Sequence, residues 1–248
     1  MHTAKEVIAS DFEEAGDEDV FRKLRGDFDA AGVAQSDDEI RGKMLDLMDQ
    51  AVSEKMVQDT KVAVVYHSGY GHTKVQAEQV LAGALSVENT DAILFEAAEA
   101  IEKIDKLDEV DAIIFGSPTY MGTVSAPFKA FMDASSTKWM EQAWKNKIAG
   151  GFTNSASASG DKTGTLQTMS VLAAQHGMIW VGLDLPPGNN TTNGTDDAMN
   201  RMGASMGAMA QSLADTGPDV SPPKSDQQTA HYYGARIAEA AQRWGKTT

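Results

Sequence analysis

From residue 61 onward, short β-rich runs alternate with amphipathic stretches of helical periodicity, and this alternation restricts the fold most strongly. Runs such as DAIIFG at 111–116 are almost continuously apolar, which is typical of parallel strands covered on both faces. The pattern predicts a doubly wound α/β domain with a five-stranded parallel sheet of order 2-1-3-4-5. The predicted strands are 61–66, 92–96, 111–116, 147–153 and 178–182, and the predicted helices are 73–86, 98–106, 125–137, 162–177 and 228–244.

Residues 1–60 contain no strand-like run, and their hydrophobic residues recur at helical spacing. Thr3 with Glu6, and Ser36 with Glu39, match the capping box that begins a helix. The sequence therefore predicts a helical extension over 1–60 and an α/β domain over 61–248. Helices of this size bury too little apolar surface to fold alone, so we expect them to pack on the main domain or on another subunit. The apolar residues concerned include Phe12, Phe21, Phe28, Ile40 and Met44.

The charge balance excludes several classes of partner. The chain carries 36 acidic against 21 basic residues, a formal net charge of −15, and no basic cluster. Such a field repels nucleic acid and anionic lipid, so we expect neither as a partner. The sequence has no signal peptide and no apolar run of about 18 residues, which predicts no membrane insertion and a cytoplasmic location. Cysteine is absent and the five histidines have no ligand spacing, so we expect no metal site.

The segment HSGYGHT at 67–73 joins the first predicted strand to the first predicted helix and has the chemistry of an anion site. Ser68 and Thr73 offer hydroxyls, and the helix start adds free N–H groups and a positive dipole. Gly69 and Gly71 permit close backbone approach. The loop carries no lysine or arginine and lacks G-x-G-x-x-G spacing, which argues against a triphosphate or a dinucleotide. A monophosphate such as that of FMN fits these donors, and an ordinary strand–helix turn is the alternative.

A second loop, GSPTYMG at 116–122, follows the third predicted strand. In a sheet of order 2-1-3-4-5 the first and third strands flank the topological switch point, where a cofactor is expected. Pro118 and Gly122 favour a turn, and Thr119 offers a hydroxyl. Tyr120 or Met121 is placed to lie along a flavin ring, although a half-buried structural role fits Tyr120 equally well.

The third loop, TNSASASGDKTGT at 153–165, follows the fourth predicted strand. Its small polar residues can donate to the pyrimidine edge of a flavin, or they can form a flexible loop. The loop contains no aromatic residue. One-electron flavodoxins commonly cover both flavin faces with aromatic side chains, so this loop predicts one open face that a hydride donor can reach.

With these loops in order, the sequence resembles the WrbA family of flavodoxin-like NAD(P)H:quinone oxidoreductases. The resemblance covers most of residues 61–245, and three loops carry it. It implies a flavodoxin-like fold, FMN and NAD(P)H as cofactors, and electron transfer from NAD(P)H to a quinone or similar acceptor. It also implies a homo-oligomer, a dimer or tetramer, in which a neighbouring subunit borders the active site. The matching stretches are YHSGYGHT (66–73), DAIIFGSPTYMGTVSAPFKAFMD (111–133), KIAGGFTNS (147–155) and LAAQHGMIWVG (172–182).

The resemblance also assigns roles to individual residues. It matches Tyr70 to a nicotinamide-contacting tyrosine and Trp139 to a substrate-side tryptophan. The flavin-side histidine of some members is Gln175 here, followed by His176, which is a candidate proton donor together with Tyr70. The implied flavin-binding residues are Ser68, Gly69, Tyr70, Gly71, His72 and Thr73 in the first loop, Thr119, Tyr120 and Met121 in the second, and Asn154, Ser155, Ala156, Ser157, Ala158, Ser159 and Gly160 in the third.

Two other functions are compatible with the same residues. The first is a flavodoxin-type one-electron carrier, which the acidic charge suits and which the aromatic-free third loop argues against. The second is a non-enzymatic flavin-binding module whose extension binds a partner. Residues 183–225, rich in Pro, Gly, Asn and Asp, predict long loops, and ordered loops of this length tend to be functional.

Overall fold

The computed structural model describes residues 59–245, together with residues 22, 25, 26, 30, 36–43, 45 and 46. The chain divides into two compact units, Met1–Gln58 and Asp59–Thr248, each described by itself. In the first unit, residues 37–43 are helical and begin with a capping box, because the Ser36 N–H donates to the Glu39 carboxylate at 2.9 Å and the Glu39 N–H donates to Ser36 Oγ at 3.4 Å. The box expected at Thr3 and Glu6 lies outside the described residues, as do Phe12, Phe21, Phe28 and Met44.

The second unit is built on a parallel sheet whose main path has the order β2-β1-β3-β5-β6. This confirms the predicted order 2-1-3-4-5, because β4 is only a two-residue strand that pairs antiparallel with the end of β3. The strands are β1 Thr60–Tyr66, β2 Thr90–Glu96, β3 Ala112–Tyr120, β4 Thr123–Val124, β5 Ile148–Ser155, β6 Ile179–Trp180 and β7 Ala208–Gln211.

The edge of the sheet beyond β5 differs from the prediction. The expected strand 178–182 is reduced to β6, which pairs only with the first residues of β5, and β7 pairs with Phe152–Ser155 further along β5. The chain leaves the sheet between these two strands and folds back on itself, with the Leu183 N–H donating to Ser205 O at 2.9 Å. The run AMAQ of β7 lies inside a segment that reads as loop, so its pairing depends on contacts that local pattern does not reveal.

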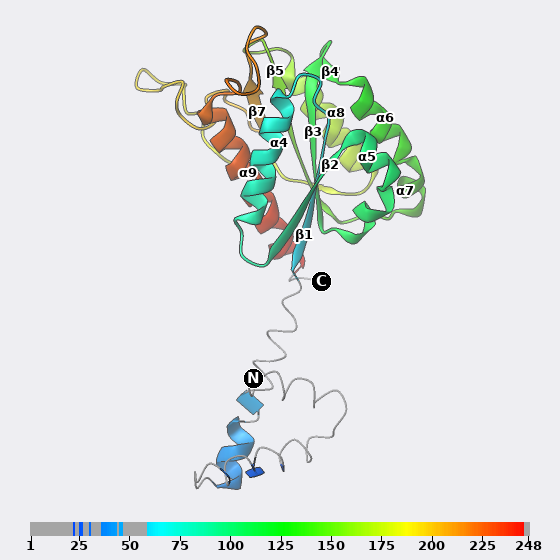
Figure 1. Cartoon of the computed structure of the whole chain (residues 1–248), viewed down its shortest axis with the longest axis vertical. Coiled ribbons are helices and arrows are strands. Elements are labelled where there is room, and N and C mark those ends of the chain that lie inside the picture. Colours follow the sequence, from blue (N-terminus) through cyan, green and yellow to red (C-terminus); the bar gives the residue numbers. More distant parts are fainter. Residues whose placement is uncertain are drawn as a thin grey trace. The chain divides into compact units, whose positions relative to one another are not determined.

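Helices cover both faces of this sheet (Figure 1). Helices α4 and α9 pack on one face, where alternate strand residues such as Val64 and Ile114 point. Helices α5, α6 and α8 pack on the other face, over residues such as Val65 and Phe115. No helix among the described residues is long and apolar enough to cross a membrane. The helices are α4 His72–Leu85, α5 Ala97–Glu102, α6 Ala126–Ala134, α7 Ser136–Glu141, α8 Lys162–Gln175 and α9 Lys224–Gly245, with a 3-10 turn at Ile104–Glu109.

Helices α4 and α9 approach closely through two glycines. A Cβ atom on Gly83 would lie 1.8 Å from the carbonyl oxygen of His231, and one on Gly234 would lie 1.9 Å from that of Val80. Each glycine thus admits the backbone of the opposite helix. This contact joins the middle of α9 to the last turns of α4 and so fixes the direction of α4 across the sheet.

We expect Gly234→Ala to lower the free energy of unfolding by about 1–3 kcal/mol, because the added methyl group forces the helices apart. Helix propensity alone would favour alanine by about 1 kcal/mol, so the sign of the change tests the packing. Urea unfolding of the FMN-free protein measures it. Gly245→Ala on the same helix is the control, because a Cβ there meets nothing within 4 Å. Equal stability of the two variants would contradict this account of the helix contact.

Candidate active site

The three predicted loops meet at one edge of the sheet. Strands β1, β3 and β5 are neighbours and parallel, so their carboxyl ends lie together, with Tyr66 opposite Gly116 and Pro118 opposite Asn154. After β1 the chain enters α4 on one face of the sheet, and after β3 it enters α6 on the other. The two connections diverge, which leaves the edge between β1 and β3 uncovered and makes it the switch point of the fold.

The first loop presents an unsatisfied donor. Ser68 Oγ is buried and has no hydrogen-bond partner among the described residues. Gly71 begins α4 with φ of +91°, and no side chain caps the helix start. Thr73, in the first turn, is buried. A buried polar atom without a partner is costly, and a helix start offers further free N–H groups, so this arrangement fits a bound phosphate.

A segment between β7 and α9 covers this first loop. The sequence predicts that segment only as part of the long loops over 183–225. A Cβ on Gly71 would lie 2.9 Å from Cγ of Pro218, so only glycine at this position lets the segment between β7 and α9 approach so closely. Nε2 of His72 lies 2.9 Å from Thr216 O. The side chain of His72 therefore joins the covering segment to the first loop.

In the second loop, most polar side chains are already used inside the protein. Thr119 Oγ1 lies 2.8 Å from the hydroxyls of both Thr153 and Thr165, so this side chain braces the loop and is not free for a ligand. Pro118 is buried beside it. Met121 and Gly122 then turn the chain with positive φ angles of 49° and 86°. The loop therefore offers a ligand its backbone and the side chains of Tyr120 and Met121.

Two tyrosines form an aromatic surface on one side of this edge. Tyr70 is 78% exposed and Tyr120 is 38% exposed, and their rings meet edge to face with centroids 6.4 Å apart. Gly69 makes room for the Tyr120 hydroxyl, which would lie 2.5 Å from a Cβ at that position. Partial burial and the neighbouring Tyr70 raise the pKa of the Tyr120 hydroxyl, so it stays protonated at neutral pH. A flat ring system fits beside these side chains.

The third loop is held from behind by a lysine that sequence reasoning did not single out. Lys162 is 1% exposed, and its Nζ donates to Ser157 O at 2.7 Å and to Ala158 O at 2.9 Å. Burial lowers the pKa of this amine to about 8, against the attraction of Asp226, which raises it. Asn154 is also committed, because its Oδ1 accepts from the Ser212 hydroxyl at 2.9 Å. Ala156, Ser157, Ala158 and Ser159 remain exposed.

The structure does not bring Gln175, His176 or Trp139 to these loops. Gln175 ends α8, whose 14 residues span about 20 Å from the third loop to the opposite edge of the sheet. His176 is buried there, stacked on Trp144 with Nε2 2.9 Å from Ser135 Oγ, and burial lowers its pKa. Trp139 lies on α7, which begins directly after Ser135, and is 52% exposed. Gln175 and His176, expected to touch the flavin, therefore lie too far from the three loops to contact a flavin bound to the same chain.

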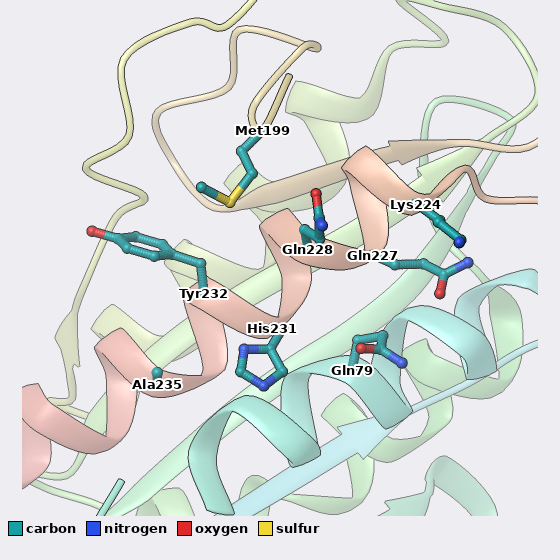
Figure 2. A pocket seen from close by; sticks show the side chains of 8 residues that line it. All are labelled: Gln79, Met199, Lys224, Gln227, Gln228, His231, Tyr232 and Ala235. Atoms are coloured by element: carbon teal, nitrogen blue, oxygen red, sulfur yellow. The ribbon is translucent and has the colours of Figure 1, made fainter. Parts of the chain in front are cut away.

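A second concave surface lies away from the loops, in the groove between α4 and α9 (Figure 2). Its volume is about 660 Å³ and its lining is rich in amide side chains. No unpartnered buried polar atom of the described residues lines it. The described residues also contain no group of His, Asp and Glu side chains that could hold a metal ion. The three-loop edge is therefore the better candidate site. The groove is lined by Gln79, Met199, Lys224, Gln227, Gln228, His231, Tyr232 and Ala235.

Comparison with known proteins agrees with this geometry. Flavodoxin FldP from Pseudomonas aeruginosa (strain UCBPP-PA14) is 45% identical over 187 residues, which are 74% of this chain and 98% of FldP. The crystal structure of a flavodoxin, WrbA-like protein from Agrobacterium tumefaciens superposes with a TM-score of 0.57 at 40% identity, over 74% of this chain and 98% of that one. The chain belongs to the WrbA-like flavodoxins. The resemblance inferred from the three loops is thereby confirmed.

Other matches concern parts of this WrbA-like flavodoxin. The family described as NADPH-dependent FMN reductase matches residues 85–186. An NAD(P)H dehydrogenase (quinone) from Archaeoglobus fulgidus is 37% identical over 132 residues, 53% of this chain and 60% of that protein. These matches confirm a flavoenzyme oxidoreductase that uses FMN and NAD(P)H. The family described as ATPase inhibitor subunit zeta matches residues 2–54, a match that the sequence analysis did not anticipate.

The residues at the three-loop edge fit FMN. Ser68, Thr73 and the start of α4 would hold the phosphate, Tyr120 would lie along the ring, and the more exposed Tyr70 would stand at the edge of the site. The exposed third loop would face the polar pyrimidine edge. When bound, FMN supplies the exchange of electrons with a nicotinamide, and the protein supplies binding, orientation and electrostatics.

We expect Ser68→Ala to weaken FMN binding by about 1.5–3 kcal/mol, roughly 10- to 150-fold in Kd, because it removes a donor to a charged phosphate. The FMN-free variant should keep its melting temperature, since this hydroxyl has no partner to lose. Fluorescence titration with FMN measures the affinity. The control is Ser170→Ala, whose exposed hydroxyl donates only to Gln167 O on α8. Unchanged affinity in the Ser68 variant would remove this residue from the site.

Proposed function

We propose that this protein transfers electrons from NAD(P)H, through FMN, to a quinone-type acceptor. The observation that carries the proposal is the asymmetry of the site. Tyr120, which Tyr70 contacts edge to face, offers an aromatic surface to the flavin, and the exposed third loop contains no aromatic side chain. One flavin face is thus left accessible to a nicotinamide and afterwards to a flat acceptor. The relative named NAD(P)H dehydrogenase (quinone) supports the same reaction.

In this proposal the protein's own groups bind and orient the reactants. Ser68 and Thr73 anchor the phosphate, which fixes the position of the ring along the edge of β1 and β3. Tyr70, which is exposed at the mouth of the site, contacts the nicotinamide, as its match in the WrbA family implies. Backbone N–H groups of residues 156–160 stabilise negative charge on the reduced pyrimidine.

A one-electron carrier of flavodoxin type is the second candidate, because the relative FldP carries that name. Stopped-flow mixing with NADH and with NADPH separates the two functions. We expect complete bleaching of the flavin without accumulation of its one-electron-reduced form, followed by reoxidation with benzoquinone. Accumulation of the one-electron-reduced flavin without nicotinamide oxidation would favour the carrier.

We also propose that a neighbouring subunit completes the active site. Ser135 bonds with both the Trp139 N–H and His176 Nε2 at the edge of the sheet opposite the loops, and Gln175 precedes His176 in the chain. The half-exposed Trp139 is placed to reach another copy of the chain, as the WrbA resemblance implies for a dimer or tetramer.

The extension supports a second function, carried by its match to the ATPase inhibitor subunit zeta family over residues 2–54. We propose that residues 1–58 bind and inhibit an ATPase, with the flavoenzyme unit attached. This assigns a partner to the extension in place of the subunit contact expected from its apolar residues. The capped helix beginning at Ser36 is compatible with an inhibitory role of this extension.

Deletion of residues 1–58 distinguishes these two roles of the extension. For the inhibitor, we expect the full chain to slow ATP hydrolysis by the source organism's purified ATPase and the truncated chain to have no effect. Light scattering should give the same number of subunits for both proteins, and quinone reduction should be unchanged. A loss of assembly on truncation, with no effect of the full chain on the ATPase, would instead support the subunit contact.

A further inference from the structure

The charges behind the third loop are unusual for a protein of net charge −15. Lys162, Arg201 and Asp226 lie together there, and all three side chains are largely buried. Two cations and one anion leave this group with a net charge of +1. Asp161, next to Lys162 in the chain, is exposed to solvent. Burying an excess positive charge costs free energy unless hydrogen bonds or an anion compensate it.

Asp226 is committed to other groups and does not neutralise Lys162. Its carboxylate accepts from Arg201 Nε and Nη2, each at 2.8 Å, and from the Gln211 N–H at 2.8 Å. Gln211 in turn donates from Nε2 to Ala156 O at 3.0 Å. Asp226 and Arg201 thus secure the start of α9 and, through Gln211, the backbone of Ala156 in the loop. The Lys162 ammonium is left for the two loop carbonyls.

The direction of those carbonyls sets the direction of the neighbouring N–H groups. The carbonyls of Ser157 and Ala158 point inward to Nζ of Lys162. Their peptide bonds are trans, so the N–H groups of the same peptide units, those of Ala158 and Ser159, point the opposite way. Within the described part of the chain, no hydrogen bond engages either N–H. The loop therefore presents two free donors on its outer face and a cation on its inner face.

We infer that Lys162 is a positioning residue for the flavin. It turns the N–H groups of Ala158 and Ser159 toward the bound cofactor, and its buried charge favours the reduced, anionic flavin over the oxidised, neutral one. The aligned peptide dipoles and the ammonium act in the same direction on a nearby anion. This inference rests on the flavin site proposed above and concerns the relative stability of the two redox states, whatever the final acceptor is.

The test compares Lys162→Gln, which keeps an amide donor but removes the charge, with Lys162→Arg, which keeps both a donor and the charge. Lys106→Gln is the matched control, because Lys106 is exposed and pairs only with Glu109 near the opposite edge of the sheet. Spectroelectrochemical titration gives the midpoint potential of the bound FMN. We expect Lys162→Gln to reduce the preference for reduced over oxidised FMN on the order of tenfold, a fall of about 30 mV for a two-electron couple. Lys162→Arg and Lys106→Gln should keep the wild-type potential.

Carbon-13 relaxation of the FMN-free protein tests the positioning separately. We expect the order parameters of residues 156–160 to fall in Lys162→Gln and not in Lys106→Gln, because the carbonyls of Ser157 and Ala158 lose their hydrogen bonds to the ammonium. In the wild type these order parameters should approach those of Lys162→Gln as the pH rises through about 8, where the lysine, facing Asp226 and Arg201, loses its charge.

Equal potentials for Lys162→Gln and the wild type, or equal shifts for Lys162→Gln and Lys106→Gln, would overturn the inference. Unchanged loop order parameters in Lys162→Gln would also overturn it. Failure of the wild type to reduce quinones would refute the proposed acceptor and leave these results unaffected. Failure of the wild type to bind FMN would refute the proposed site itself.

Discussion

The divergence of the connections that follow β1 and β3 is the constraint on which the rest of the site depends. Since α4 crosses one face of the sheet and α6 the other, neither of these two connections lies over the edge between the two strands. The close contact of α4 and α9 through Gly83 and Gly234 holds the last turns of α4, and Pro218 packs against Gly71 at its phosphate-binding start. The site is thus a consequence of chain topology, and the loops supply its chemistry.

The hydroxyl groups near this edge divide into those that form hydrogen bonds within the protein and those that are left for a ligand. Thr119 bonds with Thr153 and Thr165, and Ser125 connects Ser117 to His67 at 3.2 and 2.8 Å. Burial lowers the pKa of His67, so this network is neutral at physiological pH. Such networks make the loops rigid, and rigid loops hold their donors ready for a ligand. Ser68 alone among these hydroxyls is buried without a partner.

The positive charge near the site is arranged differently from that of phosphate loops that use a lysine. The first loop holds no lysine or arginine, so the phosphate depends on hydroxyls and backbone N–H groups. The buried cation stands instead behind the third loop, where the redox-active ring is expected. Because phosphate binding and charge stabilisation use different loops, the cation can act on the electron exchange while the phosphate site itself stays neutral.

The sequence by itself determined the sheet order, the two central loops and the family, because these depend on local patterns. Apolar runs, glycine spacing and helix starts are set by neighbours along the chain, as the capping box of Ser36 and Glu39 also illustrates. Only the tertiary structure decided which side chains are free. It committed Thr119 and Asn154 to internal hydrogen bonds, placed His176 about 20 Å from the loops, and brought Lys162 beneath residues 157 and 158. It also placed Pro218 against Gly71 and paired β7 with β5. These features join residues far apart in sequence, and their geometry follows from packing that no local pattern encodes.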